Sequence, residues 1–150
     1  MRRFRRGFTI VELLAVMAII GILARFGVPR FWEIRRRATA AAIVGDMQVI
    51  RDAALNHYQD GDQWPPDYPA GVTPAELVKY LPSQFNFTRT GHMLDFERWT
   101  VGSTSVIGIG LVTTDPNLGP AVENIMGRSM VAFSSGSSYT FLLVGLGGTF

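Results

Sequence analysis

Residues 1–29 read MRRFRRGFTIVELLAVMAIIGILARFGVP, and this stretch decides how the rest of the chain is organised. Four arginines precede Gly7, and the run from Phe8 to Ala24 that follows carries only two polar side chains, Thr9 and Glu12. An acidic side chain placed in the hydrocarbon of a membrane costs about 2.5–3.5 kcal/mol even on the lenient insertion scale. Glu12 is therefore a functional hypothesis, and it requires a cationic partner.

The stretch resembles the N-terminus of type IV pilins and type II secretion pseudopilins. The resemblance rests on residues 7–14 (GFTIVELL), residues 18–24 (AIIGILA) and Pro29. It implies that a prepilin peptidase cuts between Gly7 and Phe8, that Phe8 is then N-methylated, and that Glu12 is the family's assembly glutamate. In a filament, the Glu12 carboxylate of one subunit would meet the Phe8 amine of its neighbour. Leaving one partner of such a buried pair alone costs about 3–5 kcal/mol, which would fix the register of assembly.

Two other interpretations of this segment stay open. An ordinary secretory signal peptide also has a basic head and a short apolar core. Glu12 inside that core speaks against it, as does the absence of a small-x-small cleavage site before Arg25 and Phe26. A permanent single-span anchor is the second alternative. The uninterrupted apolar part is residues 13–24, and a membrane span needs about 20 residues, so the segment is a marginal anchor that suits a subunit extracted later.

Net charge and cysteine content bear on two questions: whether the chain binds nucleic acid, and which kind of subunit it resembles. The chain has 14 basic and 12 acidic side chains, and removal of residues 1–7 would leave 10 basic against 12 acidic. The basic character thus belongs to the leader, and we infer no nucleic-acid partner from it. The cysteine count is zero, so the fold must hold by packing alone or with a metal. By resemblance, many major pilins carry a C-terminal disulfide, so its absence favours a pseudopilin or a minor pilin-like subunit.

The helical pattern continues well beyond the apolar run. Pro29 and the weak helix former Gly21 predict a kink in the N-terminal part, and the family has its proline at the matching place. Further on, one apolar stripe combines spacings of three and four residues, as expected for a helix that covers a sheet. Its members are Ile43, Met47, Ile50, Ala54 and Tyr58. Gly61 predicts the end of this helix.

The remainder predicts a small antiparallel sheet. Residues 60–72 carry turn signals throughout, and Thr73 to Glu76 match a capping box that opens a short helix ending at Pro82. Alternation around Leu94 and Phe96 predicts a half-buried strand, and residues 105–112 predict a more buried one whose glycines allow close backbone approach. A short helix is expected at residues 120–126, and a hairpin is expected from residues 129–133 and 138–144. The predicted fold class is α+β and pilin-like: a long N-terminal helix with a protruding hydrophobic half, and an amphipathic half packed on a sheet of three or four strands.

The sequence offers few candidates for catalytic or metal-binding residues. His57 and His92 lack partners in the sequence pattern, and we expect them to be surface or packing residues. Asp60, Asp62 and Asp67 place hard oxygen ligands in one loop and form a weak calcium candidate, although their spacing does not match an EF-hand. We therefore expect no catalytic residues and no cofactor, with calcium as the exception left open.

Taken with the resemblance, the sequence predicts a prepilin leader (1–7), a transmembrane and assembly helix (8–32) and a globular head (33–150). The implied function is that of a structural subunit of a type IV pilus-like or type II secretion pseudopilus filament, and not that of an enzyme. The implied partners are prepilin peptidase, other pilin or pseudopilin subunits, the inner membrane and an assembly platform. The chain would span the inner membrane once, with its head on the periplasmic or extracellular side. The alternative is a secreted or single-span membrane-anchored binding module with no filament role.

Overall fold

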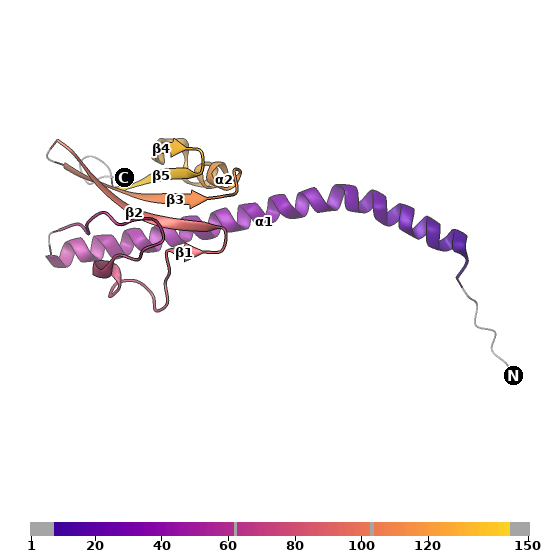
Figure 1. Ribbon diagram of the computed structural model, residues 1–150, viewed down its shortest axis with the longest axis horizontal. Coiled ribbons are helices and arrows are strands. Elements are labelled where there is room, and N and C mark those ends of the chain that lie inside the picture. Colours follow the sequence, from indigo (N-terminus) through magenta and orange to yellow (C-terminus); the bar gives the residue numbers. More distant parts are fainter. Residues whose placement is uncertain (1–7, 62, 103, 145–150) are drawn as a thin grey trace. The chain divides into compact units, whose positions relative to one another are not determined.

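The computed structural model describes residues 8–61, 63–102 and 104–144 (Figure 1). Its first element is helix α1, Ile10–Gly61, which comprises 52 residues. The chain divides into two compact units between Arg36 and Arg37, so α1 contributes to both. From Ile10 onward the N-terminal unit is helix, and the C-terminal unit combines the rest of α1 with the sheet, as expected for the predicted α+β class.

The part of α1 in the C-terminal unit is amphipathic, as its sequence pattern predicts. Its buried side chains are Ala40, Ile43, Met47, Ile50, Ala53 and Ala54. Tyr58, the last member of the predicted stripe, is only half-buried, and its ring stacks on Trp64 at a centroid distance of 4.5 Å. The helix ends at Gly61, as predicted.

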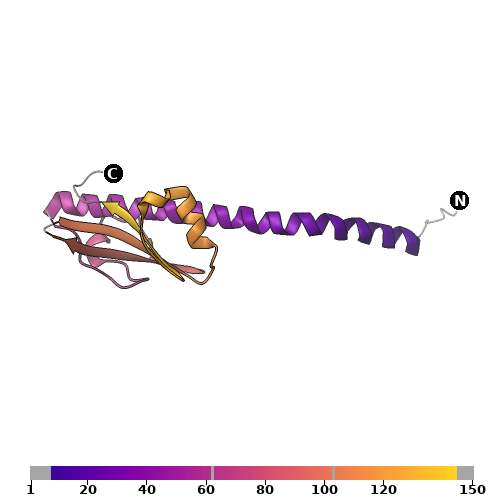
Figure 2. The same ribbon diagram turned by 90° about the horizontal axis from the view of Figure 1, so that it is seen from above.

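Five antiparallel strands form one sheet in the order β1-β2-β3-β5-β4. The strands are β1 (Thr88–Arg89), β2 (His92–Val101), β3 (Thr104–Thr113), β4 (Val131–Ser135) and β5 (Ser138–Val144). The sheet exceeds the expected three or four strands because the two-residue β1 also pairs with β2. Figure 2 shows this twisted sheet from a second direction, with β4 and β5 in the orange and yellow part of the chain.

The core lies between one face of the sheet and the buried stripe of α1. Leu94 and Phe96 of β2 and Ile109 of β3 are fully buried in it, with Phe141 contributed by β5. The predicted alternation of β2 is thus confirmed. Asp95 and Glu97 point to the other face, where Gly110 of β3 lies opposite Asp95. A Cβ at Gly110 would come within 2.7 Å of Glu97 Oε1 and 2.8 Å of Asp95 Cβ, so this glycine does permit a close approach.

The predicted capping box at Thr73 is wrong. Residues Ala75–Leu77 form only a 3-10 turn, η1, whose N-cap is Pro74, and no side chain caps it. The Glu76 carboxylate instead accepts a hydrogen bond from the Tyr68 hydroxyl (3.1 Å). Burial of Leu77 holds the turn against the core.

The loop after α1 is tied to the free edge of β2. The Tyr68 amide donates to the Phe96 carbonyl (3.0 Å) and the Gly71 amide donates to the Leu94 carbonyl (2.7 Å). Sheet edges with unpaired backbone groups invite unwanted pairing, and this loop covers that edge. Turn signals alone predicted a loop here but not this pairing.

The connection between β3 and β4 contains helix α2, Leu118–Met126, and a second 3-10 turn, η2, Arg128–Met130. The predicted helix and the predicted hairpin are both confirmed, with small shifts of their limits. The first hairpin strand begins at Val131 because Ser129 lies in η2.

Candidate assembly surface on the N-terminal helix

The N-terminal part of α1 exposes an apolar surface around its whole circumference. Phe8 is 82% exposed, and every large apolar side chain between residues 8 and 34 is also exposed. These side chains are Phe8, Ile10, Val11, Leu13, Leu14, Val16, Met17, Ile19, Ile20, Ile22, Leu23, Phe26, Val28, Phe31, Trp32 and Ile34. Exposed apolar patches of this extent mark interaction or membrane surfaces.

The same segment has the length and composition of a membrane span. Among the described residues, α1 is the one helix that is long and apolar enough to cross a membrane by these two criteria. Burying a large apolar side chain gains about 1.5–3 kcal/mol relative to leaving it in water. A surface of this size therefore requires lipid or other protein chains as its cover.

The helix begins with a capping box formed by Thr9 and Glu12. The Glu12 amide donates to Thr9 Oγ1 (3.2 Å), and Glu12 Oε2 accepts hydrogen bonds from the Thr9 amide and hydroxyl (both 2.9 Å). In such a box the N-cap side chain and the carboxylate three residues later each satisfy a backbone amide that the helix leaves unpaired. Glu12 therefore has a local structural role in this helix. The intersubunit role that the sequence suggested stays a prediction.

Sequence analysis missed this capping box, although its signal is present. Thr9-Ile10-Val11-Glu12 has the threonine-x-x-glutamate spacing that precedes an apolar helix. The same rule was applied to Thr73 and Glu76, where the structure forms no box. At Thr9, no competing side chain such as Tyr68 binds the carboxylate among the described residues.

Other site residues named from the sequence remain predictions. Gly7 lies outside the described residues, so the structure says nothing of the proposed cut before Phe8. Gly21 and Pro29 both lie within α1, which continues as helix through both positions. The kink expected there therefore stays a prediction.

Charged side chains form contacts with one another beyond the apolar run. Arg30 forms an exposed ion pair with Glu33 at 3.6 Å, and the Arg35 guanidinium lies 5.6 Å from the Trp32 ring centroid. Exposed pairs of this kind contribute at most about 1 kcal/mol. They mark the change from an apolar to a polar helix surface and do not form a closed site.

Two members of the calcium candidate, Asp60 and Asp67, have other polar partners in the structure. Asp60 accepts a hydrogen bond from the Tyr80 hydroxyl and forms an ion pair with Lys79 at 3.4 Å; these contacts lower the pKa of its carboxyl, with the Tyr80 bond the larger cause. Asp67 instead accepts a hydrogen bond from the Arg98 amide (3.2 Å). Asp62 lies outside the described residues. No group of three or more His, Cys, Asp or Glu side chains with the placement of a metal site occurs in the described part of the chain.

The two histidines occupy packing positions. The His57 ring meets the Tyr80 ring edge-on at 5.9 Å. His92 begins β2, and burial lowers the pKa of its imidazole despite the nearby Asp46 carboxylate, which acts in the opposite direction. Neither arrangement resembles a catalytic pair.

Comparison with known proteins points to the same segment. Residues 2–24 match the family model described as the prokaryotic N-terminal methylation motif. The chain is 34% identical over 80 residues to the type IV major pilin protein PilE1 of Neisseria gonorrhoeae, covering 53% of this chain and 37% of that protein. It is 37% identical over 67 residues to the type IV major fimbrial protein FimA of Dichelobacter nodosus, covering 45% of this chain and 42% of that protein.

The chain thus spans less than half the length of these curated relatives. No solved structure matches it. The motif and the relatives confirm the resemblance to the type IV pilin family that the sequence suggested.

Proposed function

We propose that this chain is a structural subunit of a type IV pilus-like filament and that it assembles through its N-terminal helix. The observation that carries the proposal is the methylation motif at residues 2–24, which overlaps the exposed apolar side chains of residues 8–34. The named relatives are pilins and fimbrial proteins, which supports a structural role and not an enzymatic one.

The proposed sequence of events follows from the chemistry of this segment. The precursor inserts into the inner membrane through its apolar helix, with its head on the periplasmic or extracellular side. A prepilin peptidase cuts between Gly7 and Phe8, and the new amine of Phe8 is methylated. An assembly platform then moves the subunit from lipid into the filament, where the apolar side chains of residues 8–34 pack against those of other subunits.

Glu12 and Phe8 provide the proposed polar contact within that apolar surface. The capping box neutralises none of the Glu12 charge, because its donors are an uncharged amide and a hydroxyl. The Phe8 amine of a neighbouring subunit would supply the missing positive charge, and burial of either group alone would be costly. This pairing would select the axial register of each incoming subunit.

A type II secretion pseudopilus is the second candidate filament. The observation that favours it is the absence of cysteine from this chain, given the disulfide that the resemblance leads us to expect in many major pilins. The two candidates share the same assembly chemistry. They differ in whether filaments extend from the cell surface or stay within the envelope.

The test is incorporation of the chain into filaments. A tagged chain would be expressed in a host that makes pili, and sheared filaments would be probed for the tag by immunogold electron microscopy. We expect the intact chain in filaments and a matched chain lacking residues 8–32 to be absent from them. A full-length chain that is processed and abundant in the membrane, yet never found in surface or envelope filaments, would support the membrane-anchored binding module.

A further inference from the structure

We propose that Met47, Met126 and Met130 form a binding site for Cu(I), with their thioether sulfurs as ligands. The site lies in the C-terminal unit, in a cavity of about 290 Å³ between α1, α2, η2 and β5. It uses none of the residues of the assembly surface, so the proposal stands independently of filament formation.

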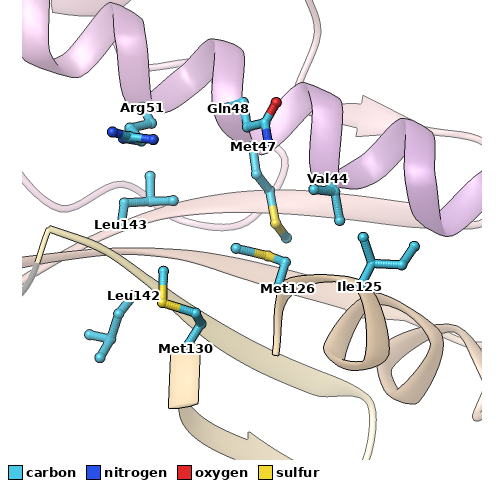
Figure 3. A pocket seen from close by; sticks show the side chains of 9 residues that line it. All are labelled: Val44, Met47, Gln48, Arg51, Ile125, Met126, Met130, Leu142 and Leu143. Atoms are coloured by element: carbon cyan, nitrogen blue, oxygen red, sulfur yellow. The ribbon is translucent and has the colours of Figure 1, made fainter. Parts of the chain in front are cut away.

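The three methionines come from three different elements and line the same cavity. Met47 belongs to the buried stripe of α1, Met126 is the last residue of α2, and Met130 is the last residue of η2. Figure 3 shows their thioether ends turned toward the space between the helix and the sheet. Half of the six methionines in the chain therefore meet at one place.

The cavity is accessible from one side and its methionine side chains are flexible, and both properties suit the binding of a metal ion. Met47 is fully buried, whereas Met126 and Met130 are half-buried and form the more accessible side of the cavity. Methionine has three rotatable side-chain bonds and a polarisable sulfur, so its thioether can adjust to a ligand. The buried Met47 would fix one coordination position, and the other two residues would close over the ion.

The types of side chain that line the cavity determine which metal ion it would bind. No carboxylate, imidazole or thiol occurs among the described residues that line the cavity. Thioethers are soft neutral ligands that favour Cu(I), whereas Ca²⁺ and Mg²⁺ require hard oxygen ligands. The Arg51 guanidinium also lines the cavity, near Leu143 (Figure 3), and its positive charge further disfavours divalent ions relative to a monovalent one.

Apolar packing is the competing explanation. Val44, Ile125 and Leu142 line the same space, and methionine commonly fills irregular gaps in a core. Packing alone requires apolar volume, which leucine would supply as well as methionine. Metal binding requires the sulfur, so methionine-to-leucine substitutions separate the two explanations.

The test is a titration of the full chain in detergent micelles, with methionine methyl groups labelled with ¹³C. Ag(I) serves as a redox-inert probe of the same softness, followed by Cu(I) in competition with a chromogenic chelator under anaerobic conditions. We expect saturable shifts of the Met47, Met126 and Met130 methyl signals, with the Met17 and Met93 signals unchanged. Met126→Leu and Met130→Leu should each weaken binding about tenfold or more, and the exposed control Met93→Leu should not.

Each outcome decides between the two explanations. Leucine is a volume-conserving replacement for methionine, and thermal unfolding would verify that both variants remain folded. Equal shifts of all methionines, binding without saturation, or unchanged affinity in both folded variants would overturn the proposal in favour of packing. A response to Zn²⁺ equal to that to Ag(I) would also overturn it.

Discussion

Glu12 has one observed role and one proposed role, and two substitutions separate them. Its carboxylate completes the capping box with Thr9, and it is the proposed counter-charge for the Phe8 amine of a neighbouring subunit. Glutamine also serves at this position of a capping box, because its amide oxygen accepts the same hydrogen bond. Glu12→Gln therefore removes the charge and keeps the cap, whereas Glu12→Leu removes both.

For Glu12→Leu we expect normal or improved membrane insertion, intact cleavage after Gly7, and impaired incorporation into filaments. Loss of the carboxylate makes the segment more apolar, so insertion should not suffer. If pairing with the Phe8 amine is the important role, Glu12→Gln should assemble as poorly as Glu12→Leu. A co-assembly assay with wild-type subunits measures this. Wild-type incorporation of mature Glu12→Gln subunits would leave capping as the only role of Glu12.

Asp95 gives a pH prediction for the globular unit. Burial raises the pKa of this carboxyl to about 6, with the Glu97 and Asp67 charges adding to the effect. Because the folded state holds the proton more tightly than the unfolded state, the stabilisation from this proton is present below the unfolded pKa of about 4 and is lost as the pH rises through about 6.

We therefore expect Asp95→Asn to increase the free energy of unfolding by about 1 kcal/mol near pH 8, after allowance for the partial exposure of the site, and by little near pH 4. Urea unfolding at the two pH values measures the difference. Asp52→Asn, at an exposed position of α1, is the matched control. An equal effect at both pH values would mean that ionisation of Asp95 is not the cause.

At the scale of elements, Gly110 of β3 allows the side chains of Asp95 and Glu97 on β2 to approach the backbone of β3 closely. A Cβ on Gly110 would lie 2.8 Å from Asp95 Cβ, an atom fixed to the backbone, whereas a Cβ on Gly45 of α1 would meet no atom within 4 Å. We expect Gly110→Ala to destabilise the fold by about 1–3 kcal/mol through overpacking. Gly45→Ala should instead stabilise it by about 0.5–1 kcal/mol, because alanine is the better helix former. Thermal unfolding of both variants measures this, and a Gly110→Ala variant as stable as Gly45→Ala would contradict the close contact.

Most elements could be predicted because their patterns are local. The stripe through Ile43 and Met47 and the alternation through Leu94 and Phe96 both express one-sided burial, which the structure confirms. At the Ala75 turn the capping box was misjudged: the Glu76 carboxylate binds the hydroxyl of Tyr68, eight residues earlier in the chain. Pairing of Tyr68 and Gly71 with β2 likewise depends on tertiary contacts that no local pattern contains.

The candidate site was predicted in part. The long ordered motif around Gly7 and Glu12 indicated the assembly segment, and the comparisons confirm the family resemblance. The capping role of Glu12 was not predicted, although Thr9 and Glu12 have the required spacing. The methionine cavity was not predictable, because Met126 and Met130 meet Met47 only after α2 and η2 have packed on α1.

At the scale of the whole molecule, the two units differ in what covers their apolar side chains. The C-terminal unit buries its own core, whereas the apolar side chains of residues 8–34 are exposed. A chain beginning at residue 33 should therefore fold as a soluble monomer, since its amphipathic helix requires only the sheet as cover. Circular dichroism and gel filtration test this. An aggregated or unfolded product would mean that residues 8–32 contribute to the core of the globular unit.

The intact mass of the chain purified from cells that contain a prepilin peptidase tests the account most directly. We expect loss of residues 1–7 and addition of one methyl group at Phe8, and we expect Gly7→Val to retain the leader, because a β-branched side chain obstructs the approach of the peptidase to the backbone. Cleavage beyond Arg25, or a normal mature mass for Gly7→Val, would contradict the assignment of this segment as a prepilin leader and assembly helix.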